Sequence, residues 1–183
     1  MSNLKSKKGH FLVANSTLQD PNFTATVVLL IEHDDSGAFG LIVNRVSEIH
    51  LSAAIENLSM KAQSVPLFEG GPVRTDALFI LHSEKQLAKP GDRVVDGVFM
   101  SSEKAQLEKL LETESNFHVY HGYSGWAPGQ LEAEIEAKSW VIVPAKAEII
   151  FHENPENAWR EALAHQGGLF EYFAQNVRDP FLN

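Results

Sequence analysis

Short apolar runs, separated by glycine, proline and acidic residues, recur along the chain and are typical of buried strands. The run at 25–32 is β-branched and apolar, which suits a strand buried on both faces. A loop at 33–37 separates it from a strand at 38–44, and so short a connection predicts an antiparallel hairpin. Further strands are expected at 10–14, 65–69, 77–82, 140–143 and 148–151, at 94–100 with an interruption at Asp96-Gly97, and at 117–121, where the strand leads into a glycine-rich loop.

Helices are expected where apolar residues recur at helical spacing between start and stop signals. A stripe of leucines within 107–111 predicts one helix, with Ser101 or Ser102 as its cap. Asn154-Pro155-Glu156 predicts the start of another, because it combines a cap, a first-turn proline and an acid, and Gly167-Gly168 ends it. The remaining helices are expected at 51–58 and about 128–137, with one or two helical turns within 169–177.

Strands thus come both in adjacent pairs and separated by helices, which favours an α+β fold over a regularly alternating one. A mixed sheet of about eight or nine strands curls strongly, so a barrel-like sheet flanked by helices is expected. No repeat or linker divides the 183 residues. We therefore predict one compact α+β domain over 9–183, preceded by a flexible basic tail at 1–8.

Acidic residues dominate the charge: 24 Asp and Glu face 15 Lys and Arg, for a formal net charge of −9. Such a chain repels phosphate backbones, so direct nucleic-acid binding is not expected. Cysteine is absent, which excludes disulfides and thiolate metal sites and fits a reducing cytosol. The apolar runs are too short for a signal peptide or a bilayer span. We therefore expect a cytoplasmic protein with no membrane partner.

No set of catalytic, metal-binding or cofactor-binding residues emerges from the motifs. Ser124 follows a strand, but a nucleophile elbow needs glycine two positions later, where this chain has Trp126. His118 and His121 lie at i and i+3 of one strand, so they point to opposite faces and cannot share a metal there. Neither an HExxH motif nor a phosphate loop occurs. The sequence therefore predicts no catalytic residue, no metal and no cofactor.

The glycine-rich segment 122–135, GYSGWAPGQLEAEI, has two interpretations. In the first, Trp126 stands on a glycine platform with Gly125 beside a helix start, and Gln130 and Glu132 line the rim of a binding site. In the second, Trp126 fills the core, and the glycines let helix and sheet approach closely. The acidic helix argues against an anionic ligand, and the second interpretation is favoured.

Two further features also carry alternatives. Gly70-Gly71-Pro72 after a strand either lets a ligand approach the backbone or forms a tight corner, and the corner is favoured. His82, at the end of an apolar strand, is either a hydrogen-bonded core histidine or a polar group that lines a pocket. These residues complete the set of candidate binding positions.

Several of these segments together resemble the YqgE/AlgH family. They are GHFLVA (9–14), the hairpin at 26–45, FEGGPV (68–73), ALFILH (77–82), the 122–135 segment and IIFHENPENAW (149–159), in family order. The resemblance implies a compact α+β fold in a bacterial cytosolic protein of no established activity. The AlgH name is associated with transcriptional control of alginate synthesis, for which the acidic chain without a basic recognition helix gives no direct support.

The leading hypothesis is a non-enzymatic binding or regulatory protein, with indirect transcriptional regulation as one form, that acts through an unidentified protein partner or small ligand. The alternative hypothesis is an enzyme that uses His82 and Glu132, or His33 and Asp34, as acid and base. The predicted ligand or partner site comprises Gly70, Gly71, Pro72, His82, Gly125, Trp126, Gln130 and Glu132.

Overall fold

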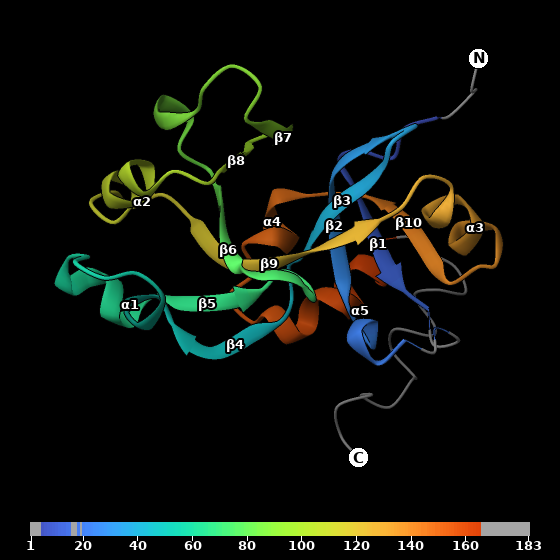
Figure 1. Cartoon of the computed structure of the whole chain (residues 1–183), viewed down its shortest axis with the longest axis horizontal. Coiled ribbons are helices and arrows are strands. Elements are labelled where there is room, and N and C mark those ends of the chain that lie inside the picture. The colour runs from blue at the N-terminus through green and yellow to red at the C-terminus, as the bar shows by residue number, and fades with distance from the viewer. Residues whose placement is uncertain (1–4, 16–17, 19, 166–183) are drawn as a thin grey trace.

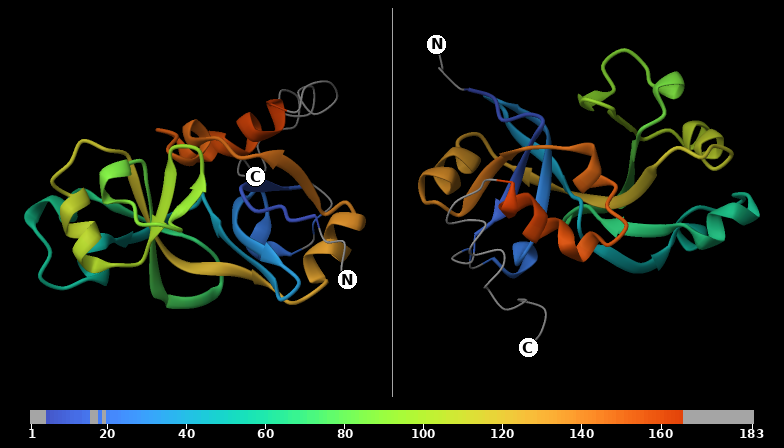
Figure 2. Two further views of the ribbon diagram at one scale, coloured as in Figure 1. Left: turned by 90° about the horizontal axis from the view of Figure 1, so that it is seen from above. Right: turned by 180° about the vertical axis from the view of Figure 1, so that it is seen from behind.

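The computed structural model describes residues 5–15, 18 and 20–165. Within them, ten strands form one strongly curled sheet (Figures 1 and 2). The strands are β1 (His10–Ala14), β2 (Val27–Asp34), β3 (Gly37–Ile42), β4 (Val46–His50), β5 (Pro66–Glu69), β6 (Val73–His82), β7 (Arg93–Val95), β8 (Val98–Ser101), β9 (Phe117–Trp126) and β10 (Trp140–Pro144). The helices are α1 (Leu51–Ala54), α2 (Lys104–Leu110), α3 (Gln130–Glu136), α4 (Ala147–Ile150) and α5 (Ala158–Ala164), with short 3-10 turns between elements.

The sheet follows the order β10-β1-β2-β3-β9-β6-β8-β7, and β5 joins β4 to β9. Its strand pairs are antiparallel except for the parallel pair of β5 and β9. Figure 1 shows two lobes, one built on β1, β2, β3 and β10 and the other on β4 to β8. The prediction of a single α+β domain with a mixed, barrel-like sheet is confirmed.

Strand β9 connects the two lobes. Its first half pairs with β5 and β6, and its last three residues pair with β3. Gly122 separates the halves with a φ of +66°, and a Cβ there would lie 2.4 Å from the Gly71 carbonyl oxygen. The prediction that a loop begins after His121 is therefore wrong, because a glycine bend keeps the chain in the sheet as far as Trp126.

One other segment differs from its predicted structure. The apolar stretch at 148–151 was predicted as a strand, but α4 occupies it and buries Ile149 and Ile150. A short apolar run fits a buried helix as well as a strand, so its periodicity could not decide. The run at 94–100 is divided into β7 and β8 by a turn at Gly97, whose φ is +71°, as its predicted interruption at Asp96-Gly97 implies. The turns expected at 169–177 lie outside the described residues.

Three apolar clusters fill the domain. Residues of β2 alternate between two of them, with Val27, Leu29 and Ile31 on one face and Val28 and Leu30 on the other. The strand is thus buried on both faces, as predicted. Helices α4 and α5 cover the first face and α3 covers the second, whereas α1 and α2 pack with β5, β6 and β9 around the third cluster (Figure 2).

The N-terminal segment is joined to the end of β2. Ser6 Oγ donates to the carbonyl oxygen of His33 at 2.8 Å, and the backbone N–H of Lys7 donates to Nδ1 of the same residue at 2.9 Å. Residues 1–4 of the predicted tail lie outside the described residues. Among the helices of the described part, none combines the length and the apolar character that a membrane span requires.

Candidate functional site

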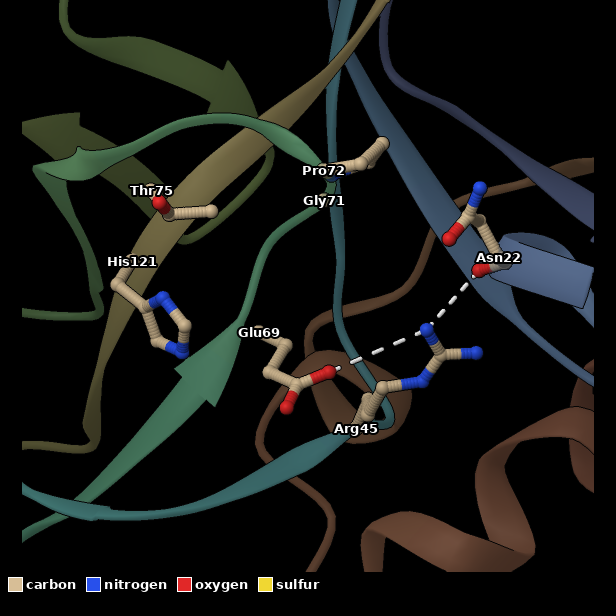
Figure 3. A pocket seen from close by; sticks show the side chains of 7 residues that line it. All are labelled: Asn22, Arg45, Glu69, Gly71, Pro72, Thr75 and His121. Carbon is tan, nitrogen blue, oxygen red and sulfur yellow. Dashed lines mark hydrogen bonds and ion pairs between the residues drawn. The ribbon is translucent and has the colours of Figure 1, made fainter.

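Two adjoining hollows lie where β4, β5, β6 and β9 meet, and they share Thr75 and His121. We refer to the two together as the His121 groove, of which Figure 3 shows the polar hollow. The polar hollow has a volume of about 240 Å³ and is lined by Asn22, Arg45, Glu69, Gly71, Pro72, Thr75 and His121. The apolar hollow has a volume of about 270 Å³ and is lined by Ile49, Ala53, Ala54, Leu67, Thr75, Asp76, Leu78 and His121.

Strand register brings the centre of the groove together. His121 of β9 is opposite Glu69 of β5 on one side and opposite Leu78 of β6 on the other. Directly opposite residues of neighbouring strands point to the same face of a sheet, so these three side chains share one face. The imidazole Nε2 lies 3.3 Å from the hydroxyl of Ser47, which also accepts the backbone N–H of Ile49 at 3.1 Å. This contact orients the ring between the two hollows.

Arg45 is held at the polar end by its neighbour Asn44. The buried amide of Asn44 accepts the N–H of Val27 at 2.8 Å and donates to the carbonyl oxygen of Ala25 at 2.9 Å. Arg45 follows Asn44 in the connection between β3 and β4, and its carbonyl oxygen accepts the N–H of Glu69 at 2.9 Å. The backbone thereby places the side chains of Arg45 and Glu69 next to each other.

The Arg45 guanidinium and the Glu69 carboxylate form a loose pair. Arg45 Nη1 lies 4.0 Å from Glu69 Oε2 and donates to the Asn22 carbonyl oxygen at 2.9 Å. The side chains are 30% and 43% exposed, and so open a pair contributes about 0–1 kcal/mol. Figure 3 shows both charges directed into the polar hollow. The hollow therefore presents a cation and an anion to whatever enters it.

The glycines of Gly70-Gly71-Pro72 face the protein interior. A Cβ on Gly70 would lie 2.3 Å from the carbonyl oxygen of Gly122, and one on Gly71 would lie 2.3 Å from the carbonyl carbon of Tyr123. The missing side chains thus allow β9 to approach the turn closely, as the tight-corner interpretation holds. Gly71 and Pro72 also form part of the wall of the polar hollow.

Trp126 lies in the core between β-sheet and α3. Its indole N–H donates to Glu134 Oε2 at 2.9 Å, and the indole N–H of Trp140 donates to the same oxygen at 2.7 Å. Gln130 donates to the other oxygen of Glu134 at 3.0 Å and accepts the N–H of Ala127 at 3.0 Å. The indole and the amide are therefore engaged within the protein, which is the geometry of the core-filling interpretation.

Glu134 was not a candidate in the sequence. It lies eight residues after Trp126 and six before Trp140, and only helix packing shows that one carboxylate faces both indoles. Neither hollow of the His121 groove is lined by Gly125, Trp126, Gln130 or Glu132. The predicted site residues therefore do not form one site: Gly71 and Pro72 line the groove, the residues from Gly125 to Glu132 lie on the α3 side of the sheet, and His82 lies at the end of β6.

His33 and Glu132 meet beneath α3. His33 Nδ1 accepts the Lys7 N–H, so its proton is on Nε2, which donates to Glu132 Oε1 at 2.6 Å. The imidazole is only 2% exposed. Asp34 instead accepts the backbone N–H of Ser36 at 2.8 Å and the Ser36 hydroxyl, and these bonds lower the pKa of the Asp34 carboxyl. The hairpin therefore does not present His33 and Asp34 together.

His82 is fully buried at the end of β6. The Gln106 amide donates to the Leu87 carbonyl oxygen at 2.7 Å, so its nitrogen also faces His82 Nε2, at 3.1 Å. The proton of the neutral ring is then on Nδ1, which has no hydrogen-bond partner within the described part of the chain. Burial lowers the pKa of His82. Its environment is that of a neutral core histidine. Strand β6, which ends at His82, lies in the opposite lobe from α3, which carries Glu132 (Figure 1).

The other residues considered for chemistry have structural environments. Ser124 is buried, and its hydroxyl donates to the Gly70 carbonyl oxygen at 3.1 Å. His118 stacks on Phe68 at a centroid distance of 4.2 Å, and burial lowers its pKa to about 4. Residues 5–15, 18 and 20–165 contain no group of three His, Asp or Glu side chains arranged to hold a metal ion.

The geometry defines a single-domain protein with a curled mixed sheet and an open groove of mixed polarity. Outside the groove, His33 and His82 are buried and hydrogen-bonded within the protein. Residues 11–171 match the AlgH-like family, and the chain belongs to it. A UPF0301 protein of Chlorobaculum tepidum is 35% identical over 181 residues, covering 97% of this chain and 96% of that protein. A UPF0301 protein of Thioalkalivibrio sulfidiphilus is 36% identical over 163 residues, covering 86% and 88%.

Two solved structures share the fold. The solution structure of AlgH from Pseudomonas aeruginosa matches with a TM-score of 0.77 and 33% identity, covering 97% of this chain and 98% of that chain. A crystal structure from Corynebacterium diphtheriae matches with a TM-score of 0.79 and 22% identity, covering 95% and 94%. The resemblance to the YqgE/AlgH family is thereby confirmed.

Proposed function

We propose that this protein is a non-enzymatic binding protein that takes a small ligand or a short partner segment into the His121 groove. The supporting observation is the pairing of a polar hollow, with two half-exposed charges, and an apolar hollow that share one histidine. Ligand sites commonly combine an apolar lining with a few convergent polar groups. A regulatory role, including indirect transcriptional regulation in the cytoplasm, would follow from the bound state acting on a partner protein.

The charge of the chain supports action through a partner. The net charge of −9 opposes the neutralisation of phosphates from which nucleic-acid binding gains most of its strength. An effect on transcription would therefore pass through another protein.

The enzymatic alternative has less support. A general acid or base must reach its substrate within hydrogen-bond distance. His33 is 2% exposed and both ring nitrogens are engaged, and His82 is fully buried. The groove itself contains the Ser47–His121 contact, but no acidic group bonds to the other ring nitrogen among the described residues.

Blocking the apolar hollow tests the proposal. Ala53→Trp places a large side chain on an exposed lining residue, and Ala133→Trp on exposed α3 is the matched control. In a thermal-shift screen of metabolites, a groove ligand at 100 times its Kd stabilises the native state by about 2.7 kcal/mol. The wild type and Ala133→Trp should respond to it, and Ala53→Trp should not. Equal responses from all three proteins would place binding elsewhere, and turnover of the ligand would refute a non-enzymatic role.

A further inference from the structure

We infer that the His121 groove binds a free amino acid with an apolar side chain, its carboxylate on Arg45 and its ammonium on Glu69. The inference rests on the proposed binding function and assigns a ligand class to the same site. It follows from three features of the groove: two opposite charges, the distance between them and the apolar hollow beside them.

The two charges favour a ligand that carries both signs. A simple anion would be attracted by Arg45 but repelled by the Glu69 carboxylate. A simple cation would be attracted by Glu69 but repelled by Arg45. An α-amino acid carries its ammonium and its carboxylate on one carbon atom, so it can satisfy two protein charges that lie close together. Arg45 Nη1 and Glu69 Oε2 are 4.0 Å apart, at the outer limit of an ion pair. Each group can therefore turn to a ligand at little cost.

Arginine suits the carboxylate end of such a ligand. Its guanidinium has five N–H donors in a planar fork that matches a carboxylate. The contacts of the Arg45 guanidinium within the described residues are the Asn22 carbonyl oxygen and the Glu69 carboxylate, both made by Nη1. The Nη2 and Nε donors therefore remain for a ligand carboxylate in the polar hollow, and Glu69 remains for the ammonium.

The apolar hollow receives the side chain. Ile49, Ala53, Leu67 and Leu78 line it next to His121, and Ile49 is 48% exposed. Covering these surfaces favours a branched aliphatic side chain over a polar one. The one carboxylate among the lining residues of this hollow, Asp76, lies 3.3 Å from Arg74 Nη2. That pairing leaves the ligand ammonium to Glu69.

Leucine and three of its relatives test this assignment. N-acetylleucine lacks the ammonium, leucinamide lacks the carboxylate, and glycine lacks the side chain. Isothermal titration of the full chain should give leucine the lowest Kd, with each relative weaker by about tenfold or more, since each loses one charged or apolar contact. Two-dimensional NMR should place the leucine-induced shifts on residues of the groove.

Charge-neutral variants assign each contact. Arg45→Gln should raise the Kd of leucine to that of leucinamide and leave the Kd of leucinamide unchanged. Glu69→Gln should raise the Kd of leucine to that of N-acetylleucine. Arg45→Lys keeps the charge but lacks the planar donors of the guanidinium, so its Kd for leucine should lie between those of the wild type and Arg45→Gln. Melting curves without ligand verify that each variant is folded.

The outcomes separate this inference from the proposed function. Equal binding of leucine and N-acetylleucine by the wild type would overturn it, as would variants that leave the Kd of leucine unchanged. A different outcome is that leucine shows no binding to the wild type at millimolar concentration while another screened ligand stabilises the wild type but not Ala53→Trp. In that case the amino-acid assignment is wrong and the groove remains a binding site. If no ligand distinguishes Ala53→Trp from the wild type, both proposals fail.

Discussion

His33 Nε2 lies 2.6 Å from Glu132 Oε1, although the two residues are 99 positions apart in the chain. Because Nδ1 of the same ring accepts the Lys7 N–H at 2.9 Å, one imidazole joins the N-terminal segment, β2 and α3. The ring acts as a structural connector, and this role accounts for a buried histidine at the end of a hairpin strand.

Replacement of His33 by alanine should therefore destabilise the fold. The change removes a buried side chain and leaves the Lys7 N–H and the Glu132 carboxylate without their partner, at a cost of about 1–3 kcal/mol. Urea denaturation measures this loss, and amide exchange at Lys7 should become faster. Glu132→Gln should cost less, because Glu132 is 37% exposed. A His33→Ala protein as stable as the wild type would contradict the connector role.

Glu134 should matter more to stability than its place on a polar helix suggests. Its Oε2 accepts the indole N–H groups of Trp126 and Trp140, so Glu134→Ala leaves the donors of two buried indoles unpaired. We expect a loss of about 1–3 kcal/mol in the free energy of unfolding. Glu134→Gln keeps one acceptor oxygen, so its free energy of unfolding should lie between those of the wild type and Glu134→Ala. Replacement of the neighbouring exposed Glu136 by alanine is the control, and it should change stability by less than about 0.5 kcal/mol.

Folding stability should fall as the pH drops below neutrality, with His118 as one cause. Its pKa is about 4 in the folded protein against 6.5 for an unperturbed histidine, so between these values the unfolded chain binds more protons. The stabilisation is complete above pH 6.5 and is lost as the pH falls toward 4, by up to about 3 kcal/mol. His118→Phe keeps an aromatic ring against Phe68 and should show a smaller loss between pH 7 and 5. Equal pH dependence of both proteins would show that His118 does not contribute.

Two glycines with positive φ should respond differently to alanine. Gly71 has a φ of +150°, and an added Cβ would lie 2.3 Å from the Tyr123 carbonyl carbon. Gly91 has a φ of +97° with nothing within 4 Å of the added atom. Gly91→Ala should therefore cost only backbone strain of about 1 kcal/mol, and Gly71→Ala should cost at least about 3 kcal/mol. Comparable melting temperatures for the two variants would show that the close approach of β9 to this corner is easily relaxed.

The fold was largely predictable because its central strands carry the signal locally. Apolar residues on both faces of β2 predicted a doubly buried strand, and the short connection to β3 predicted the hairpin. The errors arose where tertiary contacts decide. Gly122 resembles a loop residue in the sequence, and only the pairing of β9 with β6 before it and with β3 after it shows that the strand continues. The apolar run of Ile149 and Ile150 fits a strand as well as a helix.

The groove was less predictable than the fold. Gly71 and Pro72 were candidates because their turn signal is local, but Arg45 and Ser47 carry no motif. His121 was considered only as a metal ligand. Arg45 meets Glu69 because residues 24 positions apart pair through the β4–β5 region, and Glu69 meets His121 through a parallel pair of distant strands. Single-sequence periodicity contains no information on such long-range register.

The position of β1 has a consequence for synthesis on the ribosome. This first strand lies between β2 and β10, with His10 opposite Pro144. Its second hydrogen-bonding edge consequently stays uncovered until residues 140–144 have been made. Unpaired strand edges in nascent chains invite aggregation, so a nascent chain that still lacks the tenth strand should be more prone to aggregate than one in which that strand has paired with the first.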